Sequence, residues 1–127
     1  MRTYLFCLTC GLVLLSTASA KSQNDLSRAL ATINNVGNGG VGHDDTIVAW
    51  QAVAKQSIDN VPQIMKAINK ENPLAANWIR SAADQIIENH VKAGGKVPAK
   101  AMEKIVFDQT YAPRARRMAY ELSLIHI

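Results

Sequence analysis

Three adjacent side chains that could bind a metal ion occur at His43-Asp44-Asp45. Protein zinc sites draw His, Cys and carboxylate ligands from separated positions, whereas three neighbouring residues rarely converge on one ion. Glu88 and His90 are two residues apart, so on a helix they face different sides and cannot form a zinc-binding i, i+4 pair. We therefore predict no metal site. We interpret Asp44 or Asp45 as a helix cap, where a carboxylate accepts free backbone N–H groups and complements the helix dipole.

Two carboxylates that could act as general acid and base, Asp84 and Glu88, are four residues apart and share one helix face. Glycosidases hold such a pair about 5–10 Å apart across a cleft, usually on different elements. Lys92 follows Glu88 by four residues and Arg80 precedes Asp84 by four, so surface ion pairs explain both acids. The sequence therefore predicts no catalytic residue.

Two tryptophans, Trp50 and Trp78, could stack on a sugar ring. Both lie on apolar stripes at helical spacing, which favours a place in the core, because large aromatic side chains dominate cores. The residues predicted to form the structural core are Trp50, Ile64, Ile68, Trp78, Ile79 and Ile86.

Basic residues are spread along the chain except at Arg114, Arg116 and Arg117. Arg114 and Arg117 fall on a similar helix face and could bind an anionic partner or pair with acids of a helix expected downstream of Glu121; we favour pairing, because isolated exposed charges carry little information. Nucleic-acid binding needs a denser positive face with a reading motif, and we predict none. The positive charge is otherwise interpreted as solvation of helix surfaces.

Residues 1–20 are typical of a cleavable signal peptide. Arg2 forms the positive n-region, an apolar run ends near Leu15, and small residues follow as far as Ala20. Signal peptidase accepts only small side chains beside the cleaved bond, so cleavage is predicted between Ala20 and Lys21. A membrane-spanning helix would need ~20 apolar residues, more than this run provides. We expect an exported chain, periplasmic or extracellular, without a stable membrane span.

The two cysteines, Cys7 and Cys10, both lie in this predicted signal peptide. Their C-x-x-C spacing could suggest a redox pair, but the spacing alone is weak inside a hydrophobic leader. The mature chain then contains no disulfide, no thiolate nucleophile and no cysteine ligand, and we predict no cofactor. An exported domain without disulfides must be held together by its core.

Residues 21–43 are expected to form a flexible N-terminal segment. Leu26, Leu30 and Ile33 predict one short helix, and a glycine-rich linker follows it. A phosphate-binding loop would require Gly-Lys-Ser/Thr before a helix, whereas Gly42 is followed by His43. The glycines therefore indicate a linker.

From residue 44 to residue 121 apolar residues recur at helical spacing, and no segment alternates like a strand. Caps, prolines and glycines predict helices that begin near Asp44, Asn60, Pro73, Pro98 and Pro113. Asn72 is predicted to cap the helix that begins at Pro73, and Gly94-Gly95 is predicted to end it. The predicted fold is all-α, with antiparallel helix pairs stacked as a short α-solenoid or a small helical bundle. The two predicted pairs cover residues 44–70 and 73–109.

Four stretches, residues 49–54, 61–68, 74–80 and 113–121, make the region 44–121 resemble the HEAT-repeat-like helical domains of exported bacterial proteins. Such repeats conserve size and polarity more than identity. The resemblance implies a scaffold or protein-interaction module that is usually part of a longer protein. It transfers no catalytic residue.

Residues 122–127 resemble one reading frame of a transposon adapter used in sequencing libraries. We therefore expect genuine sequence to end near Glu121, and His126 to have no functional role. The sequence as a whole predicts an exported helical-repeat scaffold that binds a protein partner or supports downstream domains. The alternative is the N-terminal, non-catalytic part of a larger exported enzyme such as a hydrolase.

Overall fold

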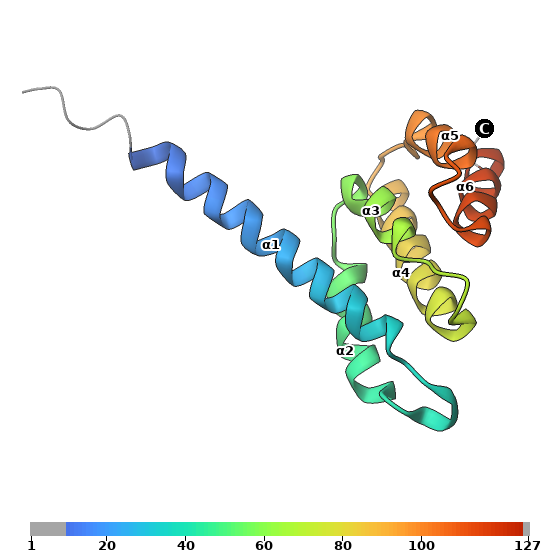
Figure 1. The fold of residues 1–127 in the computed structure, drawn as a ribbon. Coiled ribbons are helices and arrows are strands. Elements are labelled where there is room, and N and C mark those ends of the chain that lie inside the picture. Colours follow the sequence, from blue (N-terminus) through green and yellow to red (C-terminus); the bar gives the residue numbers. More distant parts are fainter. Residues whose placement is uncertain (1–9, 126–127) are drawn as a thin grey trace, which may run out of the picture.

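Helix α4 (Pro73–Lys92) lies at the centre of the structure and packs against α1, α2, α3 and α6. The computed structural model describes the backbone of residues 10–125 and the side chains of residues 18–124 (Figure 1). Within this range the other elements are α1 (Cys10–Asn34), η1 (Asn38–Gly40), α2 (His43–Ala54), η2 (Ile58–Asn60), α3 (Val61–Lys66), α5 (Ala99–Phe107) and α6 (Pro113–Ile125).

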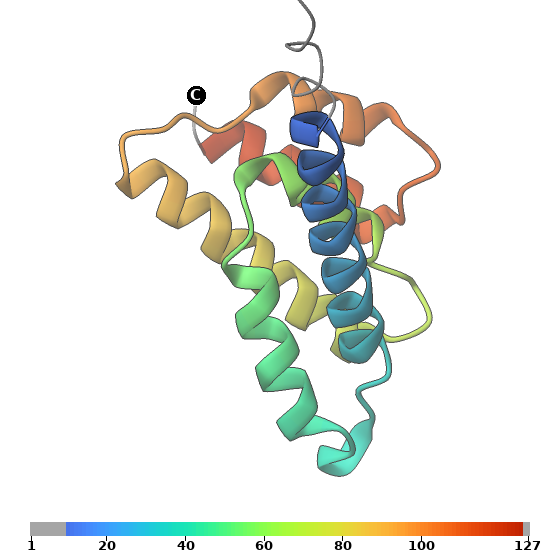
Figure 2. The same ribbon diagram turned by 90° about the vertical axis from the view of Figure 1, so that its left-hand side faces the viewer.

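The all-α fold class is confirmed, because every regular element of the described residues is a helix. The most extensive packing joins α1 to α2, which run in opposite directions (Figure 2), and α5 to α6. The pairs predicted from the sequence, α2 with α3 and α4 with α5, are therefore wrong. The loop after α2 directs α3 away from α2, and the loop after α4 directs α5 away from α4. The apolar faces of these helices pack against other helices instead.

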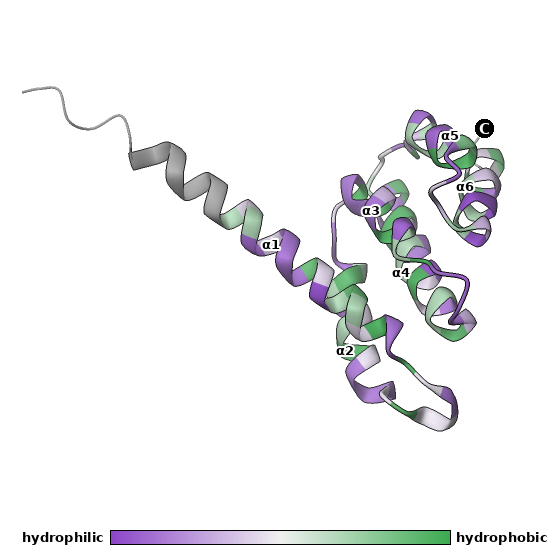
Figure 3. Cartoon of the chain, in the orientation of Figure 1, coloured by the Kyte–Doolittle hydropathy of each residue, from purple (hydrophilic) through white to green (hydrophobic). Residues whose placement is uncertain are grey.

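One hydrophobic core runs from Leu26 in α1 to Leu122 in α6. Hydrophobic and polar residues alternate around the helices that enclose it (Figure 3). The predicted core residues Ile64, Ile68, Ile79 and Ile86 are buried in it. The two tryptophans differ from the prediction: Trp50 and Trp78 are only partly buried and pack against the edge of the core.

The segment predicted to be flexible contributes to this core. Leu26, Leu30 and Ile33 are buried on one face of α1, and Val36 follows them just after the helix ends. The helical domain therefore begins well before residue 44. The short helix predicted here is part of a 25-residue helix. The glycine-rich linker is confined to the tight connection between α1 and α2, where Gly39, Gly40 and Gly42 adopt positive φ.

Helix α2 begins differently from the prediction. Its N-cap is Gly42, and neither Asp44 nor Asp45 caps it, although both lie in its first turn, where their charge complements the helix dipole. The hydroxyl of the buried Thr46 donates a hydrogen bond to the Gly42 carbonyl at 2.7 Å. A backbone bend at a left-handed glycine therefore replaces the expected carboxylate cap.

Three asparagine side chains connect the end of α1 to the turn between α3 and α4. The Asn72 amide donates to the carbonyls of Asn34, at 3.1 Å, and Val36, at 2.8 Å. The Asn34 amide donates to the Ala67 carbonyl, and its side-chain oxygen accepts from the Asn69 amide, both at 3.2 Å. The bonds from Asn72 satisfy carbonyls at the end of α1 that lack a helical partner, and the bond from Asn34 satisfies the Ala67 carbonyl at the end of α3.

The same asparagines shape the start of α4. The Asn69 side-chain oxygen accepts from the backbone N–H of Glu71 and Asn72, and the Asn72 oxygen accepts from Ala75 N–H at 3.1 Å. Asn72 is thus the helix cap that the Asn-Pro sequence predicted. Because its amide nitrogen bonds α1, one side chain fixes the start of α4 relative to the end of α1.

Hydrogen bonds also satisfy the carbonyls at the ends of α4 and α5. At the end of α4, Gly95 N–H donates to the His90 carbonyl and Gly94 N–H to the Val91 carbonyl, with Gly94 at φ +88°. This is the Schellman arrangement that two successive glycines allow. In α6, Arg116 donates from Nε to the Val106 carbonyl at 2.9 Å, which satisfies the end of α5.

Replacing Asn72 should separate its two roles. Asn72→Ala removes the cap and the link to α1, and we expect a loss of about 2–3 kcal/mol in the free energy of unfolding. Asn72→Ser keeps a capping oxygen but cannot reach the α1 carbonyls, so we expect a loss of about 1 kcal/mol. Urea unfolding measures both, with Ser81→Ala, an exposed change in the same helix, as control. Full stability in Asn72→Ser would show that the link contributes nothing.

Candidate functional site

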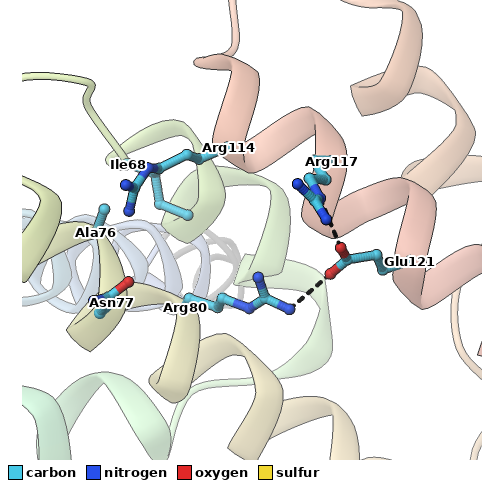
Figure 4. Close-up of a pocket in the computed structure, with 7 residues that line it drawn as sticks. All are labelled: Ile68, Ala76, Asn77, Arg80, Arg114, Arg117 and Glu121. Atoms are coloured by element: carbon cyan, nitrogen blue, oxygen red, sulfur yellow. Dashed lines mark hydrogen bonds and ion pairs between the residues drawn. The ribbon is translucent and has the colours of Figure 1, made fainter.

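Arginine side chains from two helices gather around a cavity of about 250 Å³ between the end of α3, the first turns of α4 and the exposed side of α6 (Figure 4). We call this cavity the arginine pocket. Its lining residues are Ile68, Ala76, Asn77, Arg80, Arg114, Arg117 and Glu121.

Helical spacing places these side chains. In α6, Arg114, Arg117 and Glu121 follow i, i+3, i+7 and therefore share one face. The adjoining face carries the buried apolar residues Ala115, Met118, Ala119 and Leu122 and packs on α5. Asn77 and Arg80 share a polar face of α4. The pocket forms where these two polar faces meet.

Glu121 connects the two helices by ion pairs. Its Oε2 lies 2.7 Å from Nη2 of Arg80, and its Oε1 lies 2.9 Å from Nε of Arg117. Each arginine thus binds one oxygen of the same carboxylate. The hydrogen bonds from Arg117 and Arg80 hold the pKa of Glu121 below its usual value. About a third of the Glu121 side chain (31 %) remains exposed.

Asp84 lies at the edge of this arrangement. Its Oδ2 is 3.8 Å from Nε of Arg80. Partial burial raises the pKa of Asp84, Arg80 opposes that rise, and the nearby Glu121 charge adds to it. Arg80 is therefore shared between two carboxylates, and it holds Glu121 much more closely.

Arg114 takes part in none of the ion pairs formed within the described residues. The pocket lining therefore contains three guanidinium groups and one carboxylate, a formal charge of +2. In Figure 4 the Arg114 guanidinium lies beside Ala76, and the Asn77 side chain lies below it, facing the open space. Guanidinium groups match the geometry of carboxylates and phosphates. Anion binding is the chemistry that this lining offers.

The other candidates from the sequence lie elsewhere. His43 lies edge-on to Trp78, with ring centroids 5.6 Å apart, and no group of three or more potential metal ligands occurs among the described residues. Glu88 pairs with Lys92 at 2.6 Å. These contacts bring no further chemistry to the pocket.

Sequence reasoning identified the shared face of Arg114 and Arg117 but missed Glu121, the partner of Arg117. Glu121 follows Arg117 by four residues, the spacing of an intrahelical ion pair, and that signal was present in the sequence. The ion pair between Arg80 and Glu121 could not be predicted from the sequence, because it depends on how α6 is placed beside α4.

Comparison with models of protein families, with curated proteins and with solved structures finds no match. The resemblance to HEAT-repeat-like domains therefore stays a prediction. A search of the described residues finds no helix that is long and apolar enough to cross a membrane.

The Glu121 ion pairs predict a pH-dependent stability. Because folding lowers the pKa of Glu121, its contribution is fully present above the ordinary value of 4.5 and is lost as pH falls through the lowered folded pKa. In urea unfolding, the free energy of unfolding should therefore be larger for the wild type than for Glu121→Gln at pH 7, and the two values should converge in acid.

The matched control is Glu88→Gln, which removes an exposed i, i+4 pair of little expected value. A difference between the wild type and Glu121→Gln that stays constant down to pH 2 would contradict the assigned role of the Glu121 charge.

Proposed function

We propose that this chain is an exported helical interaction module that binds an acidic protein partner through the arginine pocket. The observation that carries the proposal is the convergence of Arg80, Arg114 and Arg117 on a pocket lined by a single carboxylate. A surface of this charge attracts acidic segments and disfavours basic ones.

The surroundings of the pocket support a protein partner. Tyr120 on α6 is a large side chain with an exposed fraction of 54 %. It follows Arg117 by three residues, so the two share a helix face. Arginine and tyrosine are enriched at protein interfaces, where apolar contact supplies affinity and charge supplies selectivity.

The exposure of α1 around Ala20 fits the proposed cleavage site. Residues 18–25 are exposed, and Leu26 is the first buried side chain in the part of the chain whose side chains the structure describes. Figure 1 shows this part of α1 reaching out past the other helices. Cleavage between Ala20 and Lys21 would therefore leave the core residues of α1 in the mature chain. The N-terminal residues 1–9, which include Arg2 and Cys7, lie outside the described residues.

Export predicts a specific mature N-terminus. When the full chain is expressed in a secreting bacterial host, N-terminal sequencing of the exported product should begin at Lys21. Ala20→Leu should accumulate the uncleaved precursor, because a bulky side chain does not fit beside the cleaved bond. Lys21→Gln, on the other side of that bond, is the control and should be processed normally. Uncleaved wild-type protein retained in the cytosol would refute export.

Partner selection can be tested without knowing the partner. Displayed random peptides selected on the protein should be enriched in Asp and Glu, with apolar residues beside them. The double variant Arg114→Gln, Arg117→Gln should bind the selected peptides at least about tenfold more weakly, and added salt should weaken wild-type binding, because the attraction is electrostatic.

The control for charge alone is Lys55→Gln, Lys100→Gln, which removes two exposed cations from other helix ends. Equal loss of binding in this control would assign the effect to net charge and not to the pocket. Enrichment of basic or uncharged peptides would refute the proposed function.

A further inference from the structure

We propose that the arginine pocket binds one side-chain carboxylate of the partner and that Glu121 occupies this carboxylate position in the free protein. The partner's aspartate or glutamate then replaces Glu121 on Arg80 and Arg117. This inference rests on the proposed function and adds the ligand group and an internal competitor for it.

The contacts of Glu121 define the site. Two guanidinium groups from different helices each donate to one oxygen of the Glu121 carboxylate, at 2.7 and 2.9 Å. Charge-assisted hydrogen bonds of this length are favourable for any carboxylate placed there. The structure therefore contains a complete carboxylate site, currently filled by a residue of the same chain.

Glu121 can leave this position without being buried unpaired. Its side chain is partly exposed and belongs to the face of α6 that carries Arg117. After rotation into solvent its charge would be hydrated, which avoids the large penalty of an isolated buried charge. Replacing one carboxylate by another also leaves the charge around Arg80 and Arg117 unchanged.

The adjacent cavity provides the approach. It has a volume of about 250 Å³ and is open to solvent, so a side chain of the partner can enter it beside the ion pairs. Arg114 and Asn77, which line the cavity beside the ion pairs, offer further donors to the entering carboxylate.

The test uses the full chain and two short synthetic peptides, one with a glutamate between leucines and one with glutamine in its place. NMR titration should give a Kd on the order of millimolar for the glutamate peptide, a range suited to one side chain, and no saturable binding for the glutamine peptide. Glu121→Gln should bind the glutamate peptide about tenfold more tightly, because the internal competitor is removed. Glu121→Asp keeps the charge on a shorter side chain, so its affinity for the glutamate peptide should lie between those of the wild type and Glu121→Gln.

Glu88→Gln is the matched control, since Glu88 also forms an i, i+4 ion pair in the same molecule. Its affinity should stay within about twofold of the wild type, the scatter expected when an exposed pair is removed. The carboxyl carbon signal of Glu121 gives an independent readout. Its pKa is below the usual range in the free protein and should return toward the ordinary value when the peptide displaces it.

Three outcomes would overturn the competition by Glu121, the proposed function, or the choice of a carboxylate as the ligand group. If Glu121→Gln binds no more tightly than Glu88→Gln, the competition fails, while acid binding that still depends on Arg114 and Arg117 preserves the proposed function. If the Arg114→Gln, Arg117→Gln variant also binds normally, both fail. If inorganic phosphate binds more tightly than the glutamate peptide at equal concentration, the site is not a carboxylate site.

Discussion

The hydrogen bonds of three asparagine amides, Asn34, Asn69 and Asn72, are the constraint on which the arrangement of the helices depends. Asn72 caps α4 with its oxygen and bonds the end of α1 with its nitrogen, so the start of the central helix is fixed by the end of the first. All these groups lie where backbone donors and acceptors would otherwise lack partners. Once α4 is placed, its buried face sets the positions of the helices packed on it, and its polar face sets the position of Arg80.

The arginine pocket follows from unequal packing around that central helix. Helix α6 packs extensively on α5 through one apolar face, and it contacts α4 much less. Long charged side chains span the remaining distance: Arg80 reaches Glu121, and Arg117 holds the same carboxylate. Apolar packing would have closed the space, whereas ion pairs between long side chains leave a cavity beside them. The arginine pocket thus exists because α4 and α6 are joined by long charged side chains and not by close apolar packing.

The sequence predicted the elements far better than their partners. Local signals such as Asn72-Pro73 and Gly94-Gly95 act within one turn, so the ends of α4 were readable. The burial of α1 was missed, because Leu26, Leu30 and Ile33 make a short stripe whose partner lies in α2 and α4. The predicted helix pairs failed for the same reason. Within the pocket, Arg114 and Arg117 could be placed on one face, but the cross-helix contact from Arg80 has no sequence period.

A binding site that is filled by its own chain has a thermodynamic consequence. With Glu121 in place, Arg80 and Arg117 share one carboxylate and α6 is tied to α4; with a partner carboxylate in place, that tie would be made by the partner. Affinity is then reduced by the fraction of molecules in which Glu121 holds the arginines. By linkage, a substitution that removes the Glu121 contact should favour binding of the partner's carboxylate. Glu121, which stabilises the free domain, is therefore also the residue that lowers the affinity for the partner's carboxylate.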